Sequence, residues 1–211
     1  MTPAGRKHFY AALQAANPEP RTELIYGTHY QLLIAVILSA QATDKSVNQA
    51  TRELFRVAPT PAAMLKLGLA GLKQHIRTIG LFNTKANNIL ATSRQLLEQH
   101  HGDVPADRAA LEALPGVGRK TANVVLNAAF AQATIAVDTH IFRVANRTGL
   151  APGRTTRAVE DRLLTVTPRE FRLHAHHWLI LLGRYVGKAR RPDCPQCPVR
   201  QWCGYRDKVS A

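Results

Sequence analysis

Residues 114–127 have the sequence LPGVGRKTANVVLN, in which two glycines follow a proline and a helical pattern then begins. Gly116 and Gly118 permit positive φ angles and close approach of another backbone, so they predict a tight turn between two helices. The second helix is expected over 119–130. Its first turn, at Arg119, would present backbone N–H groups that bind an anion such as a DNA phosphate, without base preference. An ordinary turn between helices is the alternative.

The remainder of the chain predicts helices nearly throughout, and therefore an all-α fold. Residues 32–39 are apolar on every side, which is typical of a helix buried in a core. No segment combines alternating β-branched residues with hairpin turns, as strands would. The other helices are expected around Phe9 and Leu13 and over 44–55, 61–67, 69–77, 85–100, 107–114, 138–148, 156–165 and 169–185.

Length and composition exclude several classes of protein. The 211 residues are 45% apolar and 20% charged, which is too apolar for a disordered chain. The longest apolar run, 32–40, is shorter than the roughly 20 residues that cross a bilayer. The first ten residues lack the apolar stretch of a secretory signal. We therefore expect a soluble, cytoplasmic protein with no membrane partner, and a monomer.

The charge balance points to a polyanionic partner, nucleic acid first. Lys and Arg number 28 against 14 Asp and Glu, a net charge of +14. The bases are spread over predicted helices: no acid lies between Glu53 and Glu98, and Asp138 is the one acid between Glu112 and Glu160. Charge embedded in folded segments favours a binding surface with strongly salt-dependent affinity. A basic surface without a ligand is the alternative.

Five short motifs, in the same order along the chain, resemble the endonuclease III family, the bifunctional glycosylases of base excision repair. The hairpin at 114–127 is one of them. The others are SAQATD at 39–44, TIGLFN at 78–83, VDTH at 137–140 and HHW at 176–178. The resemblance therefore covers essentially the whole chain.

The resemblance implies a fold of two helical lobes with a DNA-binding cleft between them. One lobe would be a six-helix bundle over 22–132, with a helix-hairpin-helix motif at about 107–130. The other would combine 1–21 with 133–211. The implied reaction is removal of an oxidised pyrimidine from double-stranded DNA, followed by β-elimination 3′ to the abasic site.

Lys120 and Asp138 match the family's two catalytic residues, a Schiff-base nucleophile and a carboxylate. A neutral amine can attack a sugar C1′ and hold the opened sugar. The helix dipole, Arg119 and a partly buried position would all favour the neutral amine. A carboxylate can take its proton or stabilise positive charge on the sugar. The alternatives are a solvated lysine that contacts phosphate, and an aspartate that caps the helix at 138–148.

Two further residues match family positions that fill the gap left by the damaged base. The base must leave the stack before C1′ is accessible, which costs a few kcal/mol. By resemblance, Leu81 would be an apolar wedge and Gln41 a polar filler. Residue type alone favours a core position for Leu81.

Cys194, Cys197 and Cys203 lie within ten residues, a spacing that indicates a metal or iron–sulfur site. In the family a fourth cysteine lies seven residues before the first of these and completes a [4Fe-4S] cluster. In this chain Gly187 occupies that position. We expect a labile, easily oxidised cluster in the loop 187–203.

Several alternatives remain for this loop and for the function. The fourth ligand could be Asp193, a histidine or water; a three-iron cluster, loosely held zinc or an empty site are the others. By resemblance the loop would present Arg190 and Arg191 to DNA. The missing ligand also leaves open a non-catalytic DNA-binding protein on the same scaffold. A zinc-dependent nucleic-acid protein, using the cysteines and a histidine, is the third functional hypothesis.

Overall fold

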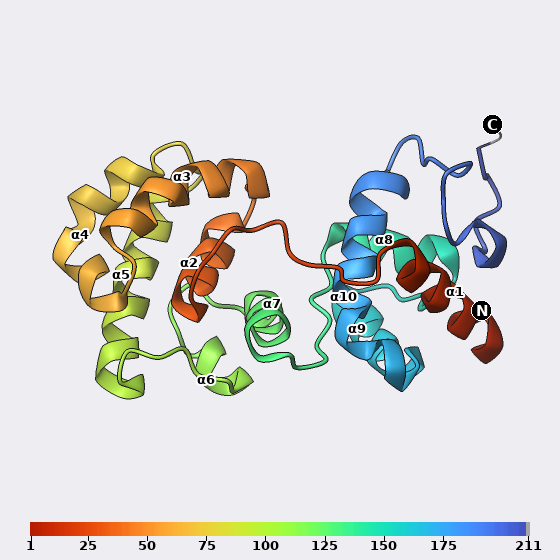
Figure 1. Ribbon diagram of the computed structural model, residues 1–211, viewed down its shortest axis with the longest axis horizontal. Coiled ribbons are helices and arrows are strands. Elements are labelled where there is room, and N and C mark those ends of the chain that lie inside the picture. The colour runs from red at the N-terminus through yellow and green to blue at the C-terminus, as the bar shows by residue number, and fades with distance from the viewer. Residues whose placement is uncertain (210–211) are drawn as a thin grey trace. The chain divides into compact units, whose positions relative to one another are not determined.

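The computed structural model describes residues 1–209. It is helical, with no strand among these residues, which confirms the predicted all-α class. The helices form two compact units, one of residues 23–130 and one of residues 1–22 with 131–211 (Figure 1). The cleft between two lobes stays a prediction. Within residues 1–209, no helix combines the length and apolar character needed to cross a membrane.

The unit of residues 23–130 is built around α2. Every side chain of this helix from Leu32 to Leu38 is buried. The helix contacts α3, α5 and α7, which surround it in Figure 1. A helix buried on all sides must be apolar all round, which is what the sequence shows. The six helices of this unit are α2 (His29–Ser39), α3 (Asp44–Val57), α4 (Pro61–Ile76), α5 (Phe82–His100), α6 (Arg108–Glu112) and α7 (Arg119–Phe130).

Local chemistry sets where these helices begin and bend. Gly68 has a φ of +71° and interrupts α4, so the two predicted segments, 61–67 and 69–77, correspond to the two halves of one kinked helix. The start of α2 lies three residues before the predicted position, because the Thr28 side chain accepts a hydrogen bond from the backbone N–H of Gln31.

The unit of residues 1–22 and 131–211 packs its helices around aromatic side chains. Tyr10 and Trp178 are buried there, and Trp178 Nε1–H donates to the carbonyl of Asn17 at 2.8 Å, which ties the N-terminal helix to the unit. Its helices are α1 (Pro3–Ala16), α8 (Thr139–Thr148), α9 (Thr156–Val166) and α10 (Arg172–Leu181), with 3₁₀ turns at Arg169–Phe171 and Arg200–Trp202.

The predicted helix over 169–185 is divided into three parts. A 3₁₀ turn precedes α10, and a π-helical turn, Leu182–Val186, follows it. Gly183, in this π-helical turn, lies too close to α8 for a side chain, because a Cβ there would approach the Cβ of His140 to 2.9 Å. The glycine lets the start of α8 pack directly on this turn. Inserted wide turns of this kind are frequent near functional sites.

Candidate functional site

The predicted hairpin joins α6 and α7. Asp107 caps α6 by accepting the Ala110 N–H at 2.9 Å, and Val117 N–H closes the turn on the Leu114 carbonyl at 3.1 Å. The Gly118 carbonyl then accepts the N–H of Ala122, which starts α7 at Arg119 as predicted. Leu114 and Val117 are buried, so the turn is anchored in the core rather than free on the surface.

The two hairpin glycines have different reasons to be glycine. Gly116 has a φ of +78°, and a Cβ there would lie 2.8 Å from Asn88 Nδ2. It is therefore required by the fold itself. Gly118 does not have a positive φ, and a Cβ there would meet nothing within 4 Å. The space beside Gly118 is open, at the N-terminus of α7 where an anion would bind.

One face of α5 holds the hairpin in place, a contact that was not predicted from the sequence. Thr92 Oγ1 donates to the Pro115 carbonyl at 2.8 Å, and Gln95 Nε2 donates to Ala113 at 3.4 Å. Asn88, in contact range of Gly116, lies one turn earlier on the same face. Asn88, Thr92 and Gln95 are spaced four and three positions apart, which places them on one face of the helix. That spacing is the signal in the sequence that would have indicated a polar contact on this face.

Lys120 is the second residue of α7 and is exposed, so the expected partial burial is wrong. The cause is the helix's apolar stripe. Ala122, Val125 and Leu126 are buried in the core, and Lys120 lies off that stripe. The placement at the positive end of the helix dipole is as predicted.

Asp138 caps α8, in the other unit. Its Oδ1 accepts the N–H of Ile141 at 2.8 Å, which confirms the capping alternative, and the side chain is half-buried. A second Oδ atom remains on the same carboxylate, so capping and a chemical role are compatible. The approach of Asp138 to Lys120 stays a prediction.

Arg143 lies one turn beyond the cap. Its Nη2 is 3.2 Å from His140 Nδ1 and donates to the Gly183 carbonyl at 2.8 Å. Burial and the neighbouring Arg147 lower the pKa of this guanidinium, and Asp138 partly opposes the effect. The cation therefore joins the start of α8 to the π-helical turn.

Gln41 and Leu81 both adopt left-handed backbone conformations, with φ angles of +56° and +59°. Such angles are uncommon for residues other than glycine. Both side chains are exposed, Leu81 to 63%, so the core position that residue type favours for Leu81 is wrong. A large apolar side chain held out to solvent on a strained turn is typical of a functional surface.

The three cysteines and Gly187 line one small cavity of about 40 Å³, with Asp193 also on its wall. Asp193 N–H donates to the Val186 carbonyl at 2.8 Å, which closes the loop on itself. The pKa of the Cys197 thiol is raised, mainly by burial, which disfavours the charged thiolate. A bound metal cation would favour the thiolate instead. Three thiols around a shared cavity fit a polynuclear cluster, which has ligands on several sides.

The Cys, His, Asp and Glu side chains of residues 1–209 do not gather around one point. Within residues 1–209, no group of three or more His, Cys, Asp or Glu side chains is placed to hold a single metal ion. No histidine lines the cavity, so Asp193 is the alternative fourth ligand that the structure brings to it.

Two arginines of α8 hold the loop by hydrogen bonds to its backbone. Arg143 Nε donates to the Gly187 carbonyl at 2.9 Å, and Arg147 donates to the carbonyls of Lys188 and Ala189 at 2.8 and 3.0 Å. The Arg147 guanidinium also lies 4.7 Å from the centre of the Tyr205 ring.

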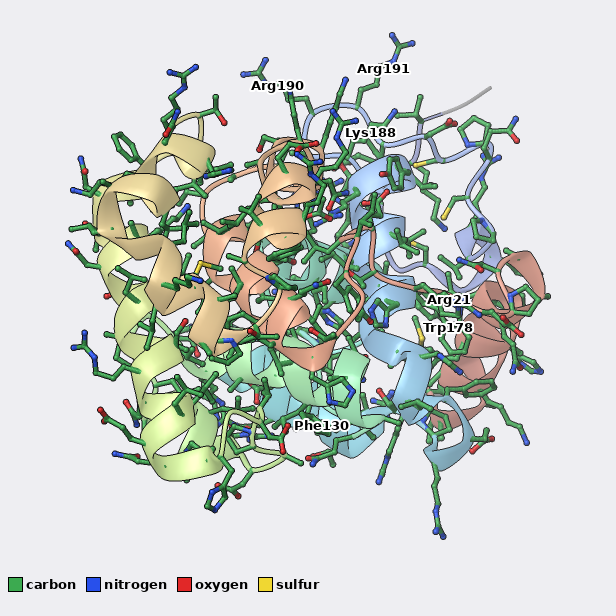
Figure 2. The ribbon with its side chains drawn as sticks, turned by 60° about the vertical axis from the view of Figure 1, so that its left-hand side comes forward. Arg21, Phe130, Trp178, Lys188, Arg190 and Arg191 are labelled. Carbon is green, nitrogen blue, oxygen red and sulfur yellow. The ribbon has the colours of Figure 1, made fainter. Side chains whose placement is uncertain are left out.

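The loop held in this way carries two exposed bases. Arg190 and Arg191 follow directly after the segment that α8 holds, and both are exposed. Figure 2 shows their side chains pointing outwards from the loop. Two cations on a tethered loop are suited to contact phosphates.

The all-helical fold and the hairpin before α7 define a class of protein. Residues 34–169 match the family model described as HhH-GPD superfamily base excision DNA repair protein. Endonuclease III of Escherichia coli (strain K12) is 60% identical over 209 residues, covering 99% of each chain. Within the superfamily, this chain belongs to the endonuclease III family.

Two solved structures extend the comparison to the fold. A non-covalent endonuclease III–DNA complex is 41% identical, with a TM-score of 0.90 over 97% of this chain and 96% of that one. A trapped endonuclease III–DNA covalent intermediate is also 41% identical, with a TM-score of 0.89 over the same shares.

Proposed function

We propose that Lys120 and Asp138 carry out the reaction of this chain, a base excision repair enzyme with DNA glycosylase and AP lyase activity towards oxidised pyrimidines. Lys120 Nζ, as the neutral amine, attacks C1′ of the damaged nucleotide, and the base leaves. The Asp138 carboxylate takes the amine proton or stabilises the positive charge that develops on the sugar. Cleavage of the C1′–O4′ bond then opens the sugar ring and gives a Schiff base between Nζ and C1′, which permits β-elimination 3′ to the abasic site.

The observation that carries this proposal is the placement of Lys120. It is exposed in the first turn of α7, directly after the open space beside Gly118. A backbone phosphate bound at that N-terminus would bring a sugar within reach of the amine. A relative trapped as a covalent intermediate with DNA supports a covalent step. The relatives are enzymes by name, which counts against a non-catalytic DNA-binding protein.

The DNA contacts in this proposal come from both units. The hairpin, with Gly116, Gly118 and Arg119, binds a phosphate of the double strand. Leu81 enters the gap left by the flipped base, and Gln41 fills the remaining space. The basic loop with Arg190 and Arg191 adds contacts that strengthen binding without reading sequence. The protein acts as a monomer.

Borohydride trapping tests the proposed chemistry. Duplex DNA with a single abasic site is incubated with the protein and sodium borohydride, which reduces the Schiff base to a stable amine. We expect a covalent adduct with the combined mass of protein and DNA, and a nick when borohydride is omitted. Folded protein that binds this duplex but forms neither adduct nor nick at any salt concentration would refute the proposal.

Matched serine substitutions at the two hairpin glycines should separate folding from DNA binding. Gly116→Ser should lower the free energy of unfolding by about 1–3 kcal/mol, because of the positive φ and the contact with Asn88. Gly118→Ser should leave stability unchanged, since serine is favourable at a helix N-cap. It should still weaken duplex binding about ten-fold, because the new side chain occupies the phosphate's space.

Denaturant unfolding and fluorescence-anisotropy titration measure the two effects. The hairpin assignment is contradicted if Gly118→Ser binds duplex DNA as tightly as the unsubstituted protein. Loss of both stability and binding in each variant would instead indicate that the turn has only a structural role.

We further propose that Cys194, Cys197 and Cys203 hold an iron–sulfur cluster, with Asp193 or solvent in place of the fourth thiolate. When bound, the cluster is structural and orders the loop 187–203. A missing thiolate leaves one iron weakly held, so the cluster is labile and easily oxidised. This proposal predicts iron and sulfide in freshly purified protein, with the visible absorbance of such a cluster.

Gly187→Cys should restore the fourth thiolate. Gly187 has a negative φ, and a Cβ there would lie no closer than 3.4 Å to its neighbours, so the side chain fits without strain. We expect higher iron and sulfide per protein and slower loss of visible absorbance in air. Gly187→Ala, which adds the same Cβ without a thiol, is the control. Equal iron content in both variants, or zinc instead of iron, contradicts this assignment.

A further inference from the structure

Lys85 is a buried cation that the proposed chemistry does not use. It lies in the first turn of α5 and is 5% exposed. Burial lowers the pKa of its amine. A buried lysine is costly unless its donors are satisfied, so its partners are informative.

The partners of Lys85 are backbone carbonyls rather than a carboxylate. Its Nζ donates to the carbonyl of Leu38 at 2.9 Å and to that of Ala40 at 2.6 Å. These carbonyls belong to the C-terminal end of α2, the negative end of a helix dipole. A cation there satisfies acceptors that the helix itself leaves unpaired.

The same residue also closes the turn on its own side. The backbone N–H of Lys85 donates to the Leu81 carbonyl at 3.0 Å, and Leu81 has no side-chain cap to hold it. Gln41 directly follows Ala40, whose carbonyl accepts from Nζ. Lys85 therefore makes a hydrogen bond to each strained turn. Its Nζ bonds to the Ala40 carbonyl, one residue before Gln41, and its backbone N–H bonds to the carbonyl of Leu81 itself. Strained conformations persist only where the surroundings fix them.

We infer that Lys85 is a positioning residue that fixes the Gln41 turn relative to the Leu81 turn, and so sets the spacing at which both side chains enter the duplex. This inference rests on the proposed function of Gln41 and Leu81. Lys85 is buried, so the role inferred for it is to position the two turns and not to bind DNA directly. An apolar residue at position 85 would fill similar volume but leave the Leu38 and Ala40 carbonyls without their donor.

Four variants test the inference and the proposed wedge on which it rests. Lys85→Met keeps most of the side-chain volume and removes the donors. Lys85→Arg keeps a cationic donor and should rescue function. Ser93→Ala is the matched control on α5, because it removes two other buried hydrogen bonds, those of Ser93 with Tyr30 and with the Ile89 carbonyl, each at 2.7 Å. Leu81→Ala tests the proposed wedge directly.

The substrate is a duplex with thymine glycol opposite 2-aminopurine, whose fluorescence rises when it loses its stacking partners. For Lys85→Met we expect no fluorescence rise and single-turnover excision slower by about 10- to 100-fold, as for misplaced groups. Affinity for undamaged duplex should stay within about two-fold. Ser93→Ala should behave like the unsubstituted protein on both measurements.

Each outcome decides a separate point. Normal fluorescence and excision in folded Lys85→Met overturn the inference, as does an equal loss in Ser93→Ala, which would show a general stability effect. If Leu81→Ala also leaves both measurements unchanged, the proposed wedge itself fails. If Lys85→Met does not fold, Lys85→Gln takes its place, since its shorter uncharged side chain cannot reach both carbonyls, and the same outcomes apply.

Discussion

Lys120→Ala is expected to abolish borohydride trapping and to slow strand cleavage by on the order of 10³-fold or more, because it removes the proposed nucleophile. The side chain is exposed, so its removal costs little stability. Duplex affinity should fall only slightly, since the hairpin and the basic loop remain. Adduct yield on a denaturing gel and single-turnover cleavage of abasic duplex measure the effect.

Lys45→Ala is the matched control for this variant. Lys45 is the second residue of α3, as Lys120 is of α7, and it is also exposed in the same unit. Its removal takes away the same charge at the same helical position. Lys45→Ala should trap DNA normally. A trapped adduct in Lys120→Ala at the unsubstituted yield would assign the Schiff base to another amine.

Asp138→Asn is expected to reduce excision of an oxidised pyrimidine by about 10²- to 10⁴-fold while the protein stays folded. Asparagine caps a helix nearly as well as aspartate, so the Ile141 N–H keeps its acceptor. The free energy of unfolding should change by less than about 1 kcal/mol. The variant therefore removes the carboxylate charge and keeps the cap.

Thr155→Ala is the control in the same unit, because it removes a helix cap without removing a charge. Thr155 caps α9 by accepting the N–H of Ala158 at 3.1 Å, and its loss should cost about 1 kcal/mol of stability. Excision should stay unchanged. The catalytic role of Asp138 is disproved if Asp138→Asn excises the base at the unsubstituted rate, or if Thr155→Ala loses excision to the same degree.

Features set by neighbouring residues were predictable from the sequence. Gly68 in α4, the Asp138 cap and the start of α7 at Arg119 each depend on chemistry within one turn of the chain. The order of the motifs also predicted the family, because the match extends over nearly the whole chain.

Features set by distant residues were not predictable in this way. The exposure of Lys120 depends on which face of α7 the core covers, and that of Leu81 on the left-handed turn that precedes α5. The contacts of Thr92 with the hairpin and of Lys85 with α2 join residues 23 to 47 positions apart. Helix periodicity identifies a polar residue on a face but not the carbonyl that it reaches.

The ten residues of α8 place a constraint on how this enzyme can evolve. Asp138 caps the first turn of the helix, while Arg143 and Arg147 hold the backbone of the loop that carries the exposed bases. If Asp138 and the loop bases have the roles proposed above, a substitution that rotates or shifts α8 would disturb bond cleavage and DNA affinity together. The acceptors of these two arginines are backbone carbonyls at 187–189, and a residue of any type at position 187 has such a carbonyl. A lineage could therefore replace the family's cysteine at position 187 by glycine and keep the loop attached to α8. Replacing either arginine would remove hydrogen bonds that hold the loop.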